Sequence, residues 1–379
     1  MSLAVHEATP AELLDWDART VDVAGGNVYQ SLAWARHRQG LGWRPRFLAF
    51  DDGFRLLSLE RPWPLVGGSG AYLSRGPVSA GEPASMTAER LLAAADHLAA
   101  SGVDVVASDA EIEAASGYGP LIEAGGFRPI EEVQPSRHRM ALRLPPGSTE
   151  ESVFRGASQT ARQMVRYAER AGLRVVRWDT RAGATGGGAE REDGFETPPP
   201  EALEAGGRGA FDGFYDLLAA AAARRGFGLG LRSGFVDWSA AGLAAGHVLF
   251  LQVLDSAGTF LGGATFYRHG GRLTYSHAGD RADLRRTHPG VMQLLVWRAI
   301  QLAIRDGMVE MDLAGADVAG ARRRPVESEP MYGIYAFKRA FGAEWVELAG
   351  NHERVSRPWR YLAGRLTGRL AGFSRSGRR

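Results

Sequence analysis

The sequence predicts a mixed α/β (α+β) protein made of two similar units. In the first half of the chain, a hairpin signal is followed by a helix over 87–100 and a strand over 103–108. In the second half, another hairpin signal is followed by a helix over 290–305 and a strand over 308–313. A further helix ending in glycine comes later in each half. This repeated order of hairpin, helix, strand and helix indicates a duplicated unit.

Length and composition agree with two globular domains. The chain has 379 residues, of which 45% are hydrophobic and 23% are charged. No apolar stretch is long enough to span a bilayer, and the N-terminus lacks the pattern of a signal peptide. The absence of cysteine excludes disulfides, thiolate catalysis and cysteine-ligated metals. We therefore expect a cytoplasmic protein.

Two breaks in the pattern suggest the domain limits. The run 143–150 contains two prolines and a glycine, so we expect a first domain over 1–145 and a second over 146–349. The segment 350–379 is expected to complete the first domain. Seven glycines and three consecutive prolines mark 181–208 as a flexible insertion in the second domain.

The C-terminal end of the chain is basic. From Glu353 to Arg379 there are eight arginines and one acidic residue. Such a segment attracts nucleic acid, nucleotide phosphates or anionic lipid headgroups. It also has apolar residues at helical spacing, namely Trp359, Tyr361, Leu362, Leu366, Leu370 and Phe373. A packed terminal helix with a solvated basic rim explains the composition equally well.

Lys338 is the one lysine among 45 lysine and arginine residues. On a solvated surface the two cations are close to interchangeable, but they differ where a compact, rotatable ammonium is needed. Two interpretations follow. Either Lys338 is an ordinary surface residue retained by chance, or it contacts a phosphate or a developing oxyanion.

Several common catalytic motifs are absent from the sequence. The lone lysine follows Phe337 and not glycine, which excludes a P-loop. The nine histidines form no metalloprotease motif, and no nucleophile elbow occurs. The predicted helix over 290–305 is apolar nearly all round, which indicates burial. The segment 286–290 before it leaves free backbone N–H groups that can hold an anion.

A set of short motifs occurs in an order and spacing that together form a specific signal. They are Tyr29-Gln-Ser-Leu-Ala-Trp34 with Gly42-Trp43, Ser74-Arg-Gly-Pro-Val78, Ser158-Gln-Thr-Ala-Arg162, Ala168-Glu-Arg-Ala-Gly-Leu-Arg174, Arg224-Arg-Gly-Phe227, the stretch from Pro289 through Trp297, Asp312-Leu-Ala-Gly315, and Tyr335-Ala-Phe-Lys338 with Phe341-Gly342. In these motifs the chain resembles the Fem family of aminoacyl-tRNA-dependent peptidyltransferases, which build peptidoglycan cross-bridges. The resemblance implies two tandem GNAT-like acyltransferase domains. Nothing in the sequence supplies the coiled-coil arm of the staphylococcal members, so no arm is expected.

The resemblance also bears on the acyl donor. GNAT domains that use acetyl-CoA cradle its pyrophosphate with Arg/Gln-x-x-Gly-x-Gly/Ala before the central helix. The corresponding stretch here departs from that pattern at Pro289 and Val291. Coenzyme A is therefore disfavoured, as a tRNA-dependent family requires.

The resemblance implies candidate site residues. The Phe-Lys pair of the family lies at the aminoacyl end of the site, which here corresponds to Phe337 and Lys338. Arg36 and Arg225 are candidates for the substrate diphosphate, because arginine forks match phosphate oxygens, and Trp34 lies beside Arg36 in the same motif. Family members have lysine where this chain has Arg36, which is a departure. For both arginines the alternative is a solvated surface position.

Two more residues are candidates with an open alternative. Tyr275 either hydrogen-bonds substrate or is a buried sheet tyrosine. Asp312, at a strand end, either orients the attacking amine or caps a loop.

The predicted reaction is transfer of an amino acid from aminoacyl-tRNA to the stem peptide of a UDP-linked or lipid-linked muropeptide. We expect a monomer that needs no cofactor or metal, with peripheral contact of the basic tail with anionic membrane as an option. Two alternatives stay open. One is an N-acyltransferase of the same fold with another donor or acceptor, and the other is a non-catalytic protein that binds the precursor.

Overall fold

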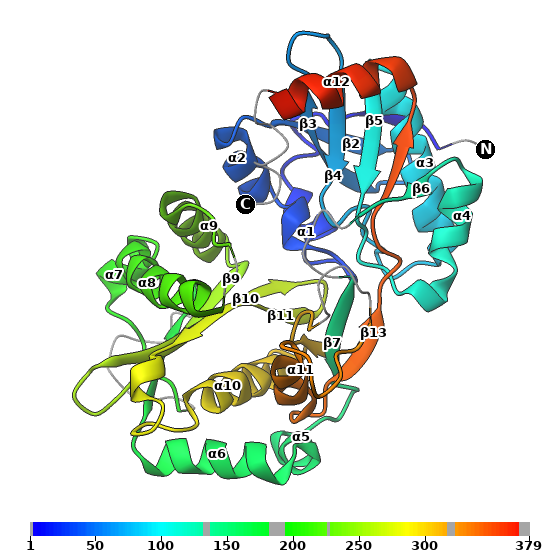
Figure 1. Ribbon diagram of the computed structural model, residues 1–379. Helices are drawn as coiled ribbons and strands as arrows, with labels where there is room; N and C mark the ends of the chain where they lie inside the picture. The colour runs from blue at the N-terminus through cyan, green and yellow to red at the C-terminus, as the bar shows by residue number, and fades with distance from the viewer. Residues whose placement is uncertain (1–2, 132–136, 182–193, 226–227, 317–322, 371–379) are drawn as a thin grey trace. The chain divides into compact units, whose positions relative to one another are not determined.

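The computed structural model describes residues 3–131, 137–181, 194–225, 228–316 and 323–370 of the chain (Figure 1). Residue contacts divide the chain into two compact units. The first unit comprises Met1–Arg139 and Val346–Arg379, and the second comprises Met140–Val318 and Arg323–Trp345.

The first unit is built on a seven-stranded sheet with the order β1-β2-β3-β4-β5-β14-β6. The strands are β1 (Val5–Glu7), β2 (Arg44–Phe50), β3 (Arg55–Pro62), β4 (Ser69–Leu73), β5 (Val103–Ser108), β6 (Arg128–Pro129) and β14 (His352–Val355). The pair β4–β5 is parallel, and the other neighbours are antiparallel. Strand β14 brings the C-terminal part of the chain into this sheet between β5 and β6.

The helices of the first unit are α1 (Trp16–Thr20), α2 (Leu32–Gly40), α3 (Ala84–Ala100), α4 (Tyr118–Ala124) and α12 (Pro358–Leu370). Helix α3 matches the predicted helix over 87–100 and connects the parallel strands β4 and β5, since a parallel pair needs a long crossover. It buries Leu91, Ala94 and Leu98 in a core that also contains Phe50 and Val106. Helix α12 contacts β5.

The second unit repeats this plan with a seven-stranded sheet of order β13-β7-β12-β11-β10-β9-β8. The strands are β7 (His138–Arg143), β8 (Arg174–Trp178), β9 (Val248–Leu254), β10 (Phe260–His269), β11 (Arg272–Asp280), β12 (Glu310–Asp312) and β13 (Glu344–Glu347). The pair β11–β12 is parallel, and the crossover between its strands contains the helix predicted over 290–305.

The helices of the second unit are α5 (Glu150–Gly156), α6 (Gln159–Arg170), α7 (Pro200–Glu204), α8 (Arg208–Arg225), α9 (Arg232–Ala244), α10 (Val291–Arg305) and α11 (Tyr332–Arg339). Helix α10 lies on one face of the sheet with α6 outside it, and α8 and α9 cover the other face (Figure 1). The predicted burial of α10 is confirmed, since Leu295, Val296 and Ile300 have no exposed surface. Among the residues that the structure describes, no helix has the length and apolar character needed to cross a bilayer.

The predicted insertion 181–208 is only partly visible, because 182–193 lie outside the described residues. The remainder packs against the unit. Phe195 is buried in the core, the backbone of Glu196 hydrogen-bonds to β8, and α7 follows. The flexible character predicted for the insertion therefore does not extend to Phe195, whose side chain belongs to the core.

Gly290 fixes the start of α10. Its φ of +89° lies in the left-handed region, and a Cβ built there would lie 2.4 Å from the carbonyl oxygen of Met164 in α6. Glycine thus serves two needs at this N-cap: an unusual backbone angle and close approach to the neighbouring helix.

A buried cluster of charges joins three elements of the second unit. Asp179, directly after β8, accepts hydrogen bonds from Arg268 at 3.1 and 2.9 Å and from Arg177 at 3.1 and 2.6 Å. Arg268 also donates to Asp306 at the end of α10 at 3.0 Å. Burial acts to raise the pKa of Asp179, but the two guanidinium groups outweigh it and lower that pKa to about 2.

We predict that Asp179 contributes to the acid sensitivity of the fold. Its folded pKa lies below the ordinary value of 3.8, so its contribution is present above about pH 4 and is lost as the pH falls towards 2. The shift corresponds to about 2 kcal/mol. Urea unfolding of Asp179→Asn at several pH values should show lower stability at pH 7 and a flatter decline below pH 4. Asp283→Asn, which removes an exposed pair with Arg281, is the control, and an equal pH response of both variants would contradict the prediction.

We also predict that Gly290→Ala destabilises the protein by about 2 kcal/mol or more, because it adds backbone strain and a steric clash. Gly213→Ala is the matched control: Gly213 lies within α8, and a Cβ there meets nothing within 4 Å. Its expected effect is stabilisation of about 0.5–1 kcal/mol from better helix propensity. Urea midpoints measure both changes, and similar midpoints for the two variants would refute the role of Gly290.

Candidate functional site

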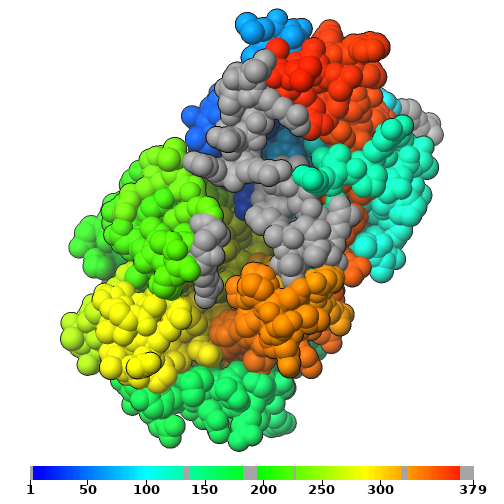
Figure 2. Space-filling model, in the orientation of Figure 1, coloured from blue at the N-terminus to red at the C-terminus, as the bar shows by residue number. Residues whose placement is uncertain are grey.

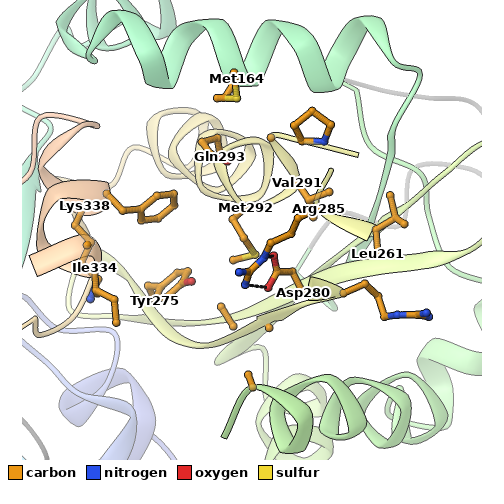
Figure 3. A pocket seen from close by; sticks show the side chains of 18 of the residues that line it. Met164, Leu261, Tyr275, Asp280, Arg285, Val291, Met292, Gln293, Ile334 and Lys338 are labelled. Carbon is orange, nitrogen blue, oxygen red and sulfur yellow. Dashed lines mark hydrogen bonds and ion pairs between the residues drawn. The ribbon is translucent and has the colours of Figure 1, made fainter. Parts of the chain in front are cut away.

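The second unit contains a cavity of about 900 Å³ between the end of β11, the start of α10 and helix α11 (Figure 3). Residues 275–276 and 278–280 of β11, 290–293 at the start of α10 and Lys338 of α11 contribute to its wall. Met164 of α6 and Arg224 of α8 also line it. The parallel crossover therefore places a helix N-terminus at the end of a strand beside an open space.

Lys338 lies in the wall of this cavity and is 5% exposed. Its Nζ donates a hydrogen bond of 2.6 Å to the carbonyl oxygen of Gly315, and it lies 5.9 Å from the centre of the Tyr275 ring. Removing an ammonium from water is costly unless acceptors replace the solvent. Burial thus contradicts the interpretation of Lys338 as an ordinary surface lysine. The hydrogen bond to Gly315 helps to offset the free-energy cost of removing the ammonium group from water.

Asp312 determines the shape of the 312–315 loop, which contains the Gly315 carbonyl oxygen bound by Lys338. It is 1% exposed at the end of β12, and its Oδ1 accepts a hydrogen bond of 2.7 Å from the backbone N–H of Ala314. Ala314 has a φ of +59°, so this contact stabilises a left-handed turn just before Gly315. Asp312 does not contribute to the cavity wall. The geometry is that of the predicted loop cap, and it connects Asp312 to Lys338 through Gly315.

Tyr275, which is labelled in Figure 3, and Phe337 both line the cavity together with Lys338. Tyr275 is partly buried on β11, with its ring 5.5 Å from that of Phe266 in an edge contact. Phe337 packs on the core and lies 5.6 Å from the Phe341 ring. The two rings give the cavity an apolar end around the single ammonium group.

The opposite part of the cavity is rich in arginine. Arg285 donates two hydrogen bonds of 2.6 Å to Asp280, and this pair raises the pKa of Arg285 (Figure 3). Arg281 also lines the cavity and is similarly paired with Asp283, which does not line it. Arg224 of α8 adds an exposed guanidinium to the cavity wall. Helix N-termini favour anions, so this part of the cavity suits a phosphate.

The other predicted site residues lie elsewhere. Trp34 and Arg36 belong to α2 of the first unit. Trp34 is 8% exposed and stacks with Tyr29 at 4.6 Å, whereas Arg36 is exposed. Arg225 is the last residue of α8, but its side chain lies outside the described residues.

Sequence reasoning did not find the cavity residues Asp280, Arg285 and Met164. Asp280 and Arg285 lie five positions apart at the end of a strand, and such a local pair is a signal for a turn and not for a site. The sequence patterns did not single out His277 either. Burial lowers its pKa to about 4, so its imidazole is neutral at pH 7, and it packs against Phe235 at 5.3 Å.

Within the described parts of the chain, no group of three or more His, Asp or Glu residues is arranged to hold a metal ion. The polar side chains of the cavity wall are arginines, Lys338, a carboxamide, hydroxyl groups, an imidazole and one carboxylate, Asp280, which is paired with Arg285. The arrangement can bind an anionic ligand at the start of α10 and place an ammonium against a developing negative charge at the other end.

Comparison with known proteins identifies the domain type of the second unit. Residues 155–339 match the family model described as "Acetyltransferase (GNAT) domain". This segment contains α6, α10, α11 and every residue that lines the cavity. It is therefore an acyltransferase-type domain. The comparison with curated proteins found no match.

Solved structures extend the likeness to the whole chain. The structure of FemX covers 95% of this chain and 100% of its own, with 17% identity and a TM-score of 0.73. L-PGS from Bacillus licheniformis covers 96% and 98%, with 14% identity and a TM-score of 0.50. A conserved protein of unknown function from Bacteroides thetaiotaomicron covers 93% and 98%, with 10% identity and a TM-score of 0.54.

At these identities the likeness concerns the fold. It agrees with the two sheets of the chain, each with one parallel pair and a helix in the crossover, and no coiled coil occurs among the described helices. The predicted resemblance to the Fem family is confirmed at the level of the fold: the chain has two tandem GNAT-like domains in a fold similar to that of FemX.

Proposed function

We propose that this protein transfers an amino acid from aminoacyl-tRNA to the stem peptide of a peptidoglycan precursor. The observation that carries the proposal is the buried ammonium of Lys338 in the wall of a cavity of about 900 Å³. That volume lies in the range of sites for small ligands and cofactors. It suits the aminoacylated end of a tRNA, and the FemX fold supports this choice of donor.

The reaction asks little covalent chemistry of the protein. An amine of the stem peptide attacks the ester carbonyl carbon of the aminoacyl-tRNA, and the carbonyl oxygen becomes an oxyanion. Collapse of this tetrahedral intermediate breaks the ester bond, with the tRNA ribose oxygen as leaving group. The proton lost by the amine balances the proton gained by that oxygen. Positioning of both substrates and stabilisation of the oxyanion therefore dominate catalysis.

We assign the oxyanion to Lys338. Its Nζ is held by the carbonyl oxygen of Gly315, so the ammonium is positioned before the substrate arrives. A preorganised donor costs no reorganisation during the reaction. Tyr275 and Phe337 enclose this end and exclude water, which strengthens the electrostatic interaction.

The phosphates next to the aminoacylated ribose are assigned to the arginine-rich end of the cavity. The N-terminus of α10 offers backbone N–H groups, and Arg224 offers an exposed guanidinium. Asp280 keeps Arg285 in a fixed orientation through two hydrogen bonds. The cavity thus has a cationic end for phosphate and an apolar end with one ammonium for the ester.

The acceptor is assigned by resemblance to the residues Trp34, Arg36 and Arg225. A diphosphate joins the sugar and the nucleotide or lipid in both forms of the precursor, and arginine forks match it. We propose that the protein acts in the cytoplasm as a monomer, without a cofactor. Asp312 has no direct role in this scheme, since its carboxylate caps the 312–315 loop.

An N-acyltransferase that uses coenzyme A is the rival function, because the matched family is described as an acetyltransferase. Pro289 and Val291 replace residues that cradle the pyrophosphate in acetyl-CoA-using domains. Calorimetric titration of the protein with coenzyme A separates the two. Binding in the low micromolar range would favour the rival, and its absence would support the tRNA-dependent reaction.

We predict that Lys338→Met lowers the transfer rate by roughly a hundred- to thousandfold, the usual loss for one oxyanion donor. Methionine keeps the length and apolar stem of lysine, so the cavity wall stays filled. The assay follows radiolabelled glycine, alanine or serine from charged tRNA to nucleotide-linked or lipid-linked pentapeptide.

Arg339→Met is the matched control for that variant. Arg339 is the next residue of α11 and is exposed, so the substitution removes the same charge outside the cavity of Figure 3. Its transfer rate should stay near that of the unmodified protein. Full activity of Lys338→Met would refute the role of the ammonium, and absence of transfer with every donor and acceptor would refute the proposed reaction.

A further inference from the structure

Helix α12 exposes a stripe of large apolar side chains. Trp359 is 84% exposed, Leu362 is 52% exposed and Leu366 is 62% exposed. Their spacing of three and four residues places them on one face of the helix. We call these three residues the α12 stripe. Single exposed leucines are ordinary on protein surfaces, but a contiguous apolar stripe marks an interaction site.

The opposite face of α12 is packed against the first unit. Gly364 is buried against the Trp63 ring, and Tyr361 lies 6.4 Å from that ring. Arg360 forms an ion pair of 3.1 Å with the buried Asp104. The helix is therefore held in place by one face while the stripe points outward. A solvated surface helix has the reverse arrangement, with polar residues outward.

The sequence left two explanations of this segment open, a site for anions and a packed terminal helix that includes Trp359, Leu362 and Leu366. The helix does pack, but it uses Gly364, which lets the Trp63 ring approach the backbone closely. The large apolar residues are left on the other side.

The loop between β3 and β4, which contacts α12, also exposes a large apolar side chain. It contains Trp63, on which α12 packs, and Leu65, which is 98% exposed at a φ of +69°. Figure 1 shows this loop beside α12, and Figure 2 shows both at the surface of the first unit. Leucine rarely adopts a left-handed backbone conformation, so the backbone conformation of Leu65 is an unfavourable one for this residue type.

All charged residues in the sequence of α12 and in the sequence that follows it are arginines. From Pro358 to Arg379 the sequence contains six arginines and no acidic residue. Arg365 is exposed on α12 at the edge of the stripe, where it donates to the hydroxyl of Tyr361. Arginine stems cover apolar surface while their guanidinium groups reach outward. Outward tryptophan and leucine with arginine at the rim are typical of helices that lie in the plane of an anionic membrane.

We propose that the α12 stripe, together with Leu65, docks this protein on an anionic lipid bilayer. Trp359, Leu362 and Leu366 enter the headgroup region, and the arginines contact lipid phosphates. RNA is a poorer match, because phosphate contacts require cations and gain nothing from outward leucines. A second copy of the chain would bring like-charged rims together, which disfavours self-association through this face.

The inference goes beyond the proposed function and does not depend on it. If the acceptor is lipid-linked, docking places the protein at the surface that holds its substrate. Binding to vesicles can be measured without tRNA or precursor, so failure of either hypothesis is visible separately.

The test is flotation of the full chain with vesicles of phosphatidylcholine alone or mixed with phosphatidylglycerol. We expect binding to the mixed vesicles that weakens with salt, and little binding to phosphatidylcholine alone. The triple variant Trp359→Ser/Leu362→Ser/Leu366→Ser should bind the mixed vesicles about tenfold or more weakly, because each apolar side chain contributes separately. Arg365→Glu should also weaken binding. The fluorescence of Trp359, obtained by subtracting the emission spectrum of Trp359→Phe from that of the unmodified protein, should shift to the blue when vesicles are added.

Leu14→Ser/Leu121→Ser is the matched control, since both leucines are exposed in the first unit away from α12. It should bind vesicles like the unmodified protein, and all variants should keep the same melting temperature within error. Unchanged binding of the triple variant would overturn the proposal, as would equal binding to neutral and anionic vesicles. The proposal would also be overturned if the unmodified protein did not bind vesicles and the triple variant lost tRNA binding or dimer formation. The stripe would then be assigned to tRNA or to a second copy of the chain.

Discussion

Helix α10 is buried on nearly every side, and the second unit is arranged around it. One face packs on the sheet, and Trp297 on another face lies 4.6 Å from Phe154 of α5. Glu150 of α5 accepts hydrogen bonds from Gln301 and Arg305, so polar contacts orient the helix as well. A rigid, buried helix fixes where its N-terminus lies. The cationic end of the cavity is a consequence of that burial, because the helix start cannot move without loss of core packing.

The ammonium of Lys338 depends on a short series of local contacts. Asp312 holds Ala314 in a left-handed turn, the turn presents the carbonyl oxygen of Gly315, and that oxygen accepts from Nζ. Each contact compensates a group that would otherwise be buried at a cost. A guanidinium is larger and planar, so it does not suit this compact arrangement. This gives a physical reason for a lysine in a chain that otherwise uses arginine.

The two units share a plan but differ in what they present. Both contain a parallel pair joined through a helix, α3 in the first unit and α10 in the second. The first unit additionally takes in β14 and α12 from the C-terminal part of the chain. In the second unit the corresponding space beside the helix start is the cavity. A duplicated fold thus supports one candidate reaction site and one outward apolar surface.

The sequence alone determined the fold class, the repeated order of hairpin, helix and strand, and the C-terminal limits of α3 and α10, because hydrophobic periodicity and glycine caps are local signals. It also singled out Lys338, since a residue used once is visible without a structure. Only the tertiary structure decided that Asp312 caps a loop outside the cavity wall. It also decided that Met164, Asp280 and Lys338 line one cavity, because the cavity joins elements that are far apart in the chain. The outward face of α12 was likewise undetermined, since helical spacing groups residues on a face but does not state which face is buried.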